Sequence, residues 1–136
     1  MAEKEVSKGL RVTADEVRDA CKGMLQLQLY AVFTKPVKGL EPVMEVLEQH
    51  LQYQISLEKR GILFGAGPFW TDDEQEWRGE GMVVIRAENL AAARTIAAED
   101  PMHAAGVRTF EIRPWLINEG SMTITLSHST RSFEVT

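Results

Sequence analysis

The segment 40–60, LEPVMEVLEQHLQYQISLEKR, constrains the fold of this chain more than any other stretch. Its apolar residues recur at three- and four-residue intervals, which at about 100° per residue places them on one broad helical face. That face comprises Leu40, Val43, Met44, Val46, Leu47, Leu51, Ile55 and Leu57. Basic residues at 59 and 60, followed by Gly61, are typical of a helix end. The pattern predicts one continuous helix from Leu40 to Arg60.

Two polar residues, His50 and Gln54, fall within this apolar arc. In one interpretation His50 is a structural core or interface residue with one hydrogen bond satisfied. In the other it is a titratable group in a half-buried pocket, placed for proton transfer near neutral pH. The helix alone does not decide between the two.

Composition limits the classes of protein to be considered. With 136 residues, 44% apolar and 26% charged, the chain has the size and composition of one ordinary globular domain. Its single cysteine, Cys21, excludes an intrachain disulfide and suits a cytoplasmic location. No apolar run approaches 18 residues, which argues against a membrane span. A net charge of −5 without a basic cluster argues against nucleic-acid binding.

The periodicity of the remaining segments predicts an alternation of strands and helices. The expected helices are Ala14–Lys22, with a capping box at Thr13 and Glu16, then 40–60 and Leu90–Glu99, capped by Asn89; the expected strands are Met24–Thr34, Ile62–Phe64, Gly81–Arg86, Val107–Trp115 and 121–127, with a last edge segment at Phe133 and Val135. The core order β-α-β-β-α-β predicts an α+β, ferredoxin-like fold. Two helices cover only one face of such a sheet, so we expect a homodimer that packs sheet to sheet.

Three regions follow from this order. We expect a frayed tail and short helix at residues 1–23, an α+β domain at 24–116, and a C-terminal strand or hairpin extension at 117–136.

Glycine and tryptophan residues mark a second candidate region. Gly65 and Gly67 leave the end of the second strand bare of side chains, either for tight packing or because a ligand approaches the backbone. The acidic segment Phe69–Glu80 is predicted to be a loop. Its Trp70 and Trp77 are either simple loop residues or a lid that closes over a flat ligand.

Asp100 precedes Pro101, and proline excludes the right-handed helical region for the residue before it. The helix must therefore end near Asp100, which places its carboxylate at the negative helix end. This position raises the pKa of a carboxyl group unless a donor such as a histidine compensates. A plain helix stop is the alternative. His103 is expected either as an exposed loop residue or as a second polar group of the pocket.

Other chemistries find little support in the sequence. His50, Asp100 and His103 could act together as metal ligands, but their spacing matches no established motif, and we predict no metal. Neither a Gly-x-Ser-x-Gly nucleophile motif nor a phosphate-binding loop is present.

Several segments together resemble the YCII-related family of small dimeric α+β barrel proteins. These are His50-Leu51, Gly61–Pro68, Gly81–Ile85, Asp100–Val107 and Arg113-Pro114-Trp115. The resemblance covers about Leu25 to Trp115 and implies that His50 and Asp100 form an active-site dyad. Leu47 stands where some relatives have an arginine, so no role of that arginine transfers to this chain.

The resemblance and the dyad together predict an enzyme without a cofactor. We expect proton-transfer chemistry (isomerase, lyase or dehydrohalogenase) on a small hydroxylated or lactone-like metabolite. His50 would be the general acid/base and Asp100 its orienting partner. The expected substrate-binding residues are Gln54, Gly65, Gly67, Trp70, Trp77 and His103. The alternative is a non-catalytic metabolite-binding or regulatory homodimer, and cofactor-independent oxygenation is a third option.

Overall fold

The computed structural model describes residues 9–136, so most of the predicted N-terminal tail lies outside the described residues. The chain divides into two compact units. The larger unit is Gln28–Leu116. The smaller unit combines the residues up to Leu27 with Ile117–Thr136.

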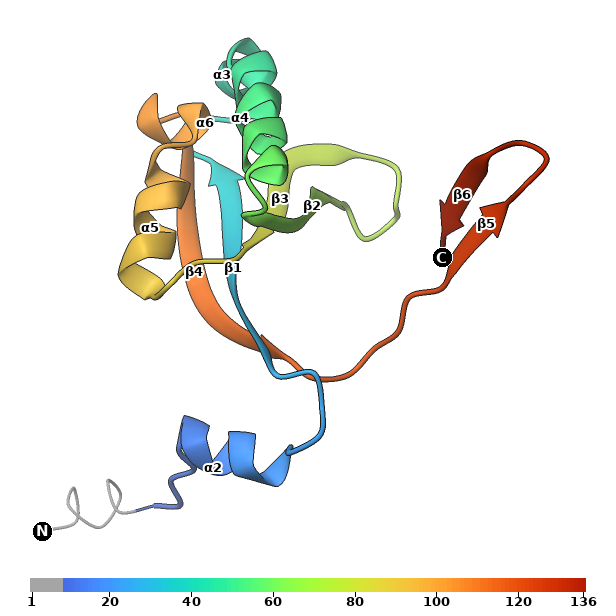
Figure 1. Cartoon of the computed structure of the whole chain (residues 1–136). Coiled ribbons are helices and arrows are strands. Elements are labelled where there is room, and N and C mark those ends of the chain that lie inside the picture. Colours follow the sequence, from blue (N-terminus) through green and yellow to red (C-terminus); the bar gives the residue numbers. More distant parts are fainter. Residues whose placement is uncertain (1–8) are drawn as a thin grey trace, which may run out of the picture. The chain divides into compact units, whose positions relative to one another are not determined.

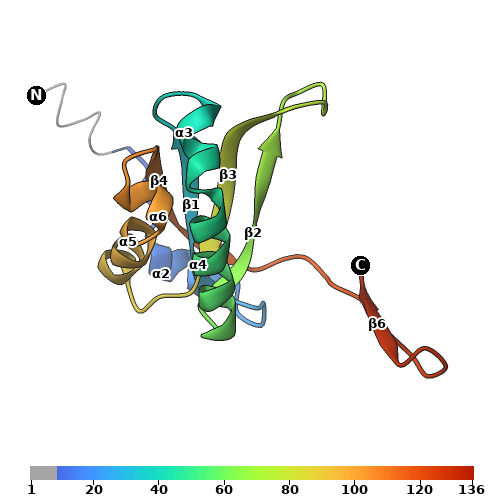
Figure 2. The ribbon, with the colours of Figure 1, turned by 90° about the horizontal axis from the view of Figure 1, so that it is seen from above.

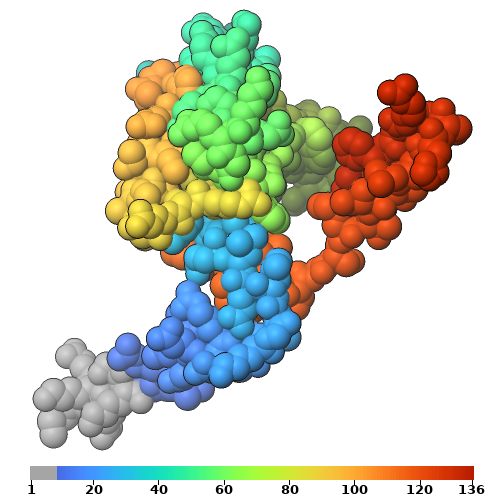
Figure 3. Space-filling view, viewed as in Figure 1, coloured from blue at the N-terminus to red at the C-terminus, as the bar shows by residue number. Residues whose placement is uncertain are grey.

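The larger unit contains the predicted α+β fold, which is confirmed (Figure 1). Its elements in chain order are β1 (Leu27–Pro36), α3 (Leu40–Glu45), α4 (Leu47–Lys59), β2 (Leu63–Trp70), β3 (Trp77–Ile85), α5 (Leu90–Ala98), α6 (Pro101–Ala104) and β4 (Arg108–Ile117). The sheet order is β2-β3-β1-β4, and β3 pairs antiparallel with both β1 and β2. The helices cover one face of the sheet (Figure 2). In the space-filling view α4 and the α5–α6 segment form one continuous surface (Figure 3).

The core lies between this sheet and its helices. The register places Tyr30 opposite Ile85 and Val32 opposite Val83, so alternate residues of β1 and β3 point to the same face. The buried cluster comprises Tyr30, Val32, Leu57, Val83, Ile85, Ala93 and Ala97. The contributions of α5 to this buried cluster are the small residues Ala93 and Ala97, and its Leu90 and Ile96 pack against the cluster.

The prediction of one continuous helix from Leu40 to Arg60 is wrong at one residue. Val46 has φ −109° and ψ 2°, outside helical values, and separates α3 from α4. Its N–H donates to the carbonyl of Val43, three residues back instead of four, so the helix tightens into a turn there.

The apolar stripe is also not uniformly buried. Val43 and Leu57 are buried, whereas Met44, Leu51 and Ile55 are about half exposed. Val43 and Leu57 pack into the interior, whereas Leu51 and Ile55 line a cavity. The apolar stripe therefore contributes to two different surfaces.

The predicted loop Phe69–Glu80 is also wrong, because strand pairing continues into it. Trp70 pairs with Trp77 across the β2–β3 hairpin, and only residues 71–76 connect the strands. The side chain of Asp73 accepts hydrogen bonds from the Thr71 hydroxyl and the Gln75 backbone N–H, which closes a tight local turn. Because this turn needs few residues, the loop is shorter than the acidic segment from which it was predicted.

The smaller unit begins with α2 (Ala14–Ala20), which is two residues shorter than predicted. Its predicted cap is confirmed, since the Thr13 side chain accepts the N–H of Glu16 at 3.1 Å. Gln26 has φ 51° and donates its side-chain amide to carbonyls at the end of α2. This left-handed residue delays the first strand, which begins at Leu27 instead of Met24.

The C-terminal residues of the smaller unit form a hairpin of β5 (Ile124–Ser127) and β6 (Ser132–Val135). Its apolar residues pair across the strands and are exposed; they are Ile124, Leu126, Phe133 and Val135. Across residues 9–136, no helix combines the length and apolar character that a membrane crossing requires.

The burial contrast on α4 yields a stability prediction. Leu57 is 1% exposed and Leu51 is 50% exposed on the same helix. Leu57→Ala should lower the free energy of unfolding by about 2–5 kcal/mol, because it removes transfer free energy and leaves a cavity. Leu51→Ala should lower it by about 1 kcal/mol or less. Urea titrations followed by circular dichroism measure both, and equal losses would contradict the division of the stripe.

Candidate active site

Asp100 occupies the junction of α5 and α6, with φ −57° and ψ 128°. Asp100 follows the C-terminal end of α5, as predicted, and it also begins the next helix. Its Oδ1 accepts the N–H of Met102 at 2.9 Å, as an N-cap does, and Pro101 takes the first helical position. A backbone donor therefore faces this carboxylate.

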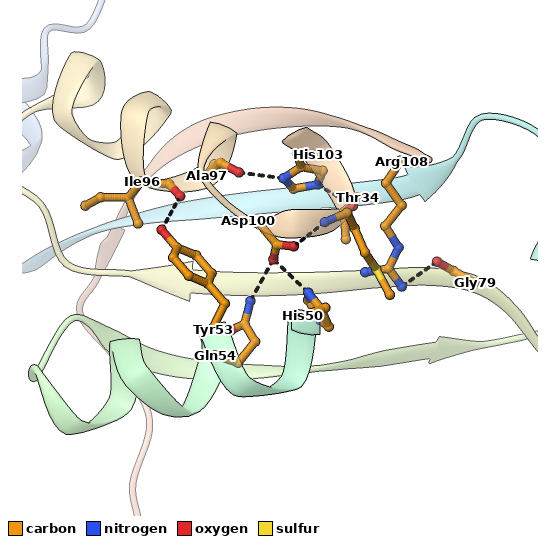
Figure 4. A network of polar contacts seen from close by, with 11 residues as sticks. Thr34, His50, Tyr53, Gln54, Gly79, Ile96, Ala97, Asp100, His103 and Arg108 are labelled. Carbon is orange, nitrogen blue, oxygen red and sulfur yellow. Dashed lines mark hydrogen bonds and ion pairs between the residues drawn. The ribbon is translucent and has the colours of Figure 1, made fainter. Parts of the chain in front are cut away.

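His50 and Asp100 are in direct contact (Figure 4). His50 Nδ1 lies 2.7 Å from Asp100 Oδ2, and their side chains are 12% and 4% exposed. Gln54 Nε2 donates to the same Oδ2 at 3.2 Å from one turn further along α4. An ionised carboxylate only accepts, so Nδ1 carries the hydrogen and Nε2 of neutral His50 is left with a lone pair.

The pKa of Asp100 lies below its ordinary value despite burial. Burial alone raises this pKa, but the hydrogen bond and charge of His50 and the N–H of Met102 outweigh it, with a smaller contribution from the charge of His103. Asp100 is therefore ionised at neutral pH.

Gln54 is the third member of this cluster. Because its amide nitrogen must face the carboxylate, its Oε1 points elsewhere, and this buried oxygen has no hydrogen-bond partner in residues 9–136. Buried acceptors are rarely left unpaired, which sets Oε1 apart from the other polar atoms of this cluster.

His103 is held by two hydrogen bonds. Its Nδ1 donates to the carbonyl of Ala97 at 2.6 Å, so neutral Nε2 accepts the hydroxyl hydrogen of Thr34 at 2.8 Å. The ring also contacts Phe110, with centroids 4.4 Å apart. His103 is thus partly buried on α6 and supports Thr34, instead of lying on an exposed loop.

A cavity of about 750 Å³ opens beside the dyad. This volume suits a small-molecule ligand. Of the predicted site residues, six line it: His50, Gln54, Gly65, Gly67, Trp70 and Trp77. Asp100 and His103 are not in its wall but contact wall residues, namely His50 and Thr34.

The glycines of β2 contribute bare backbone to this wall. A Cβ built on Gly65 or Gly67 would meet no heavy atom within 4 Å, so crowding does not require glycine there. Trp70, which is 61% exposed, pairs with Trp77 next to the turn that connects β2 and β3. They are strand residues instead of loop residues.

Among the wall residues that sequence reasoning missed, Arg108 is a buried cation. It is 6% exposed, its Nη2 donates to the carbonyl of Gly79 at 2.8 Å, and its guanidinium lies 5.9 Å from the ring centroid of Trp77. A signal existed, since Arg108 shares the strand parity of the apolar residues Phe110 and Ile112.

Metal binding by His50, Asp100 and His103 together is not supported by this geometry. Both ring nitrogens of His103 are engaged by Ala97 and Thr34. In the part of the chain that the structure describes, no group of three or more His, Cys, Asp or Glu side chains could hold a metal ion.

The environment of His103 yields a pH prediction. The pKa of His103 lies below its ordinary value, mainly because the ring is buried, and the charges of Arg108 and His50 lower it further. The hydrogen bond to the Ala97 carbonyl and the charge of Asp100 oppose this shift. As pH falls, the unfolded chain therefore binds a proton at His103 before the folded protein does. The resulting stabilisation is complete above the ordinary histidine pKa of about 6.5 and is lost as pH falls toward the lowered value.

We therefore expect the free energy of unfolding to fall less between pH 7.5 and pH 5 in His103→Gln than in the wild type. Urea titrations across this range measure both slopes. His128→Gln, at an exposed hairpin residue, should keep the wild-type slope. Parallel slopes in wild type and His103→Gln would refute the assignment.

Comparison with known proteins places this site in context. The family model for the YCII-related domain matches residues 28–116. An uncharacterized protein of Haemophilus influenzae is 35% identical over 83 residues, which are 57% of this chain and 85% of the relative.

Among solved structures, the chain is similar to the 5-chloro-2-hydroxyhydroquinone dehydrochlorinase of Burkholderia phenoliruptrix, determined in complex with 2,5-dihydroxybenzoquinone. The TM-score is 0.53 at 21% identity, and the match covers 64% of this chain and 92% of that protein. This likeness concerns the fold. The match of the family model over the whole larger unit, in contrast, identifies the chain as a member of the YCII-related domain family.

Proposed function

We propose that this protein is a small-molecule enzyme in which His50 acts as general acid/base and Asp100 orients it. One observation carries the proposal: His50 lines a cavity of about 750 Å³ while its Nδ1 lies 2.7 Å from an ionised, buried carboxylate. A carboxylate at Nδ1 fixes the tautomer and stabilises the imidazolium that forms when Nε2 takes a proton.

The proposed chemistry is proton transfer on a small hydroxylated metabolite. His50 Nε2 removes a proton from an O–H or acidic C–H of the substrate and returns it at another atom, or retains it while a leaving group departs. Asp100 stays ionised throughout, because the hydrogen bond and charge of His50 and the N–H of Met102 hold its pKa low despite burial. Isomerisation, elimination and dehydrohalogenation all fit this scheme.

The structural neighbour supports the choice of substrate class. That protein is a dehydrochlorinase of a chlorinated hydroxyhydroquinone, and its complex holds a dihydroxybenzoquinone. The cavity described here suits a compact ring because its wall is largely apolar, with two tryptophans and few polar groups.

A non-catalytic metabolite-binding homodimer is the second candidate. Phe33 and Phe69 stack with centroids 6.4 Å apart, yet remain 36% and 43% exposed. Exposed aromatic pairs of this kind favour burial against a second copy. We propose the homodimer for either function, and a monomer in sedimentation equilibrium at micromolar concentration would refute it.

Replacing His50 tests catalysis. Using 5-chloro-2-hydroxyhydroquinone as the probe, and a panel of related hydroquinones and lactones, we expect chloride release or turnover by the wild type. His50→Gln should lower kcat by about 10²- to 10⁴-fold, because it removes the general base. Asp100→Asn should also lower kcat, since it offers no charge to the imidazolium.

His128→Gln serves as the matched control and should keep wild-type kcat. If no compound of the panel is turned over while one of them raises Tm, the binding protein is the better description. Turnover that survives in His50→Gln would exclude His50 as the acid/base.

A further inference from the structure

Arg108 is a buried cation without an anionic partner. Its side chain lines the cavity and is 6% exposed, and it forms no ion pair with any side chain of residues 9–136. Its Nε is buried and has no hydrogen-bond partner in this range. Burying an unpaired charge is costly, so such a group is retained where something outside the chain compensates it.

The acidic residues nearby do not provide that compensation. Asp100 acts on Arg108 only through its charge, and its oxygens already accept from His50, Gln54 and Met102. Two other carboxylates, Glu58 and Glu80, line the cavity, but both are exposed and neither lies within ion-pair distance of Arg108. The guanidinium therefore presents a free positive charge to the cavity.

The hairpin fixes this charge in place. Gly79 has φ +87°, and a Cβ there would lie 2.5 Å from Pro36 Cγ, so only glycine turns its carbonyl toward Arg108 without strain. The indole N–H of Trp77 donates to the carbonyl of Glu80, which holds the aromatic ring near the guanidinium. One terminal nitrogen is thus anchored, while Nε keeps an unused N–H.

We propose that the cavity binds a planar oxyanion, either a carboxylate or an ionised enol, whose negative charge pairs with Arg108. The unpaired Oε1 of Gln54 accepts a hydrogen bond from a hydroxyl group of the same ligand. A guanidinium matches a planar oxyanion because it donates two parallel hydrogen bonds. The inference rests on the proposed function, because it takes the cavity beside His50 as the substrate site.

A matched pair of probes tests the charge requirement. 2,5-Dihydroxybenzoquinone is anionic at neutral pH, whereas 2,5-dimethoxybenzoquinone has the same ring and no ionisable group. Isothermal titration calorimetry should show that the wild type binds the anion more tightly. Arg108→Met should weaken anion binding by about 10- to 100-fold, the value of a charge-assisted hydrogen bond, and should leave binding of the neutral probe nearly unchanged. Benzoate in a parallel titration distinguishes a carboxylate ligand from an enolate ligand.

Two control variants define the outcome. Arg94→Met makes the same charge change on the exposed face of α5 and should not alter anion binding. Glu80→Gln should leave anion binding equal or stronger; weaker binding would show that Glu80 takes part in the site. Equal affinity of wild type and Arg108→Met for the anion, or no binding of either probe, would overturn the inference.

The stability of the ligand-free protein provides a second readout. Since an unpaired buried charge costs stability, Tm of Arg108→Met should equal or exceed that of the wild type. A clearly lower Tm would make Arg108 a structural residue and contradict the inference. Failure of the proposed function looks different, because His50→Gln would then leave turnover unchanged while the anion preference set by Arg108 persists.

Discussion

One buried carboxylate, that of Asp100, organises this structure. It accepts hydrogen bonds from His50 and Gln54 on α4 and from the backbone of Met102 on α6, and it is 3% exposed. A buried charge is tolerated only when its oxygens are satisfied, so these donors must be in place in the folded state. The same contact that joins two helices therefore also sets the tautomer and orientation of His50.

The parts of the fold set by local chemistry could be predicted from the sequence. Thr13 and Asn89 cap their helices as expected, and the order of helices and strands along the chain follows from the change of period between 3.6 and 2. The parts set by tertiary pairing could not. The extension of β2 to Trp70 arises from its pairing with β3, and neither this extension nor the break at Val46 has a composition signal.

The candidate site shows the same division. His50 could be found because a polar residue interrupts an apolar stripe, and Asp100 because proline fixes the turn that follows it. Arg108 was not predicted as a site residue because charged residues recur along β4, where Glu111 and Arg113 are exposed and Arg108 is buried. Its strand parity with Phe110 and Ile112 was a signal in the sequence, whereas its hydrogen bond to the carbonyl of Gly79 joins residues that are 29 positions apart.

His50, Asp100 and Arg108 together determine the electrostatic environment of the cavity. The negative charge of Asp100 lies beside Nδ1 of His50, where it would stabilise an imidazolium, while Arg108 lines the cavity. In the proposed reaction, a substrate that gives up a proton to His50 would become more negative at that moment, and a cation fixed before the reaction would stabilise this charge without reorganisation. Both charges would then favour the same proton transfer, so the features that make Asp100 and Arg108 costly to bury are those that would make His50 an effective base.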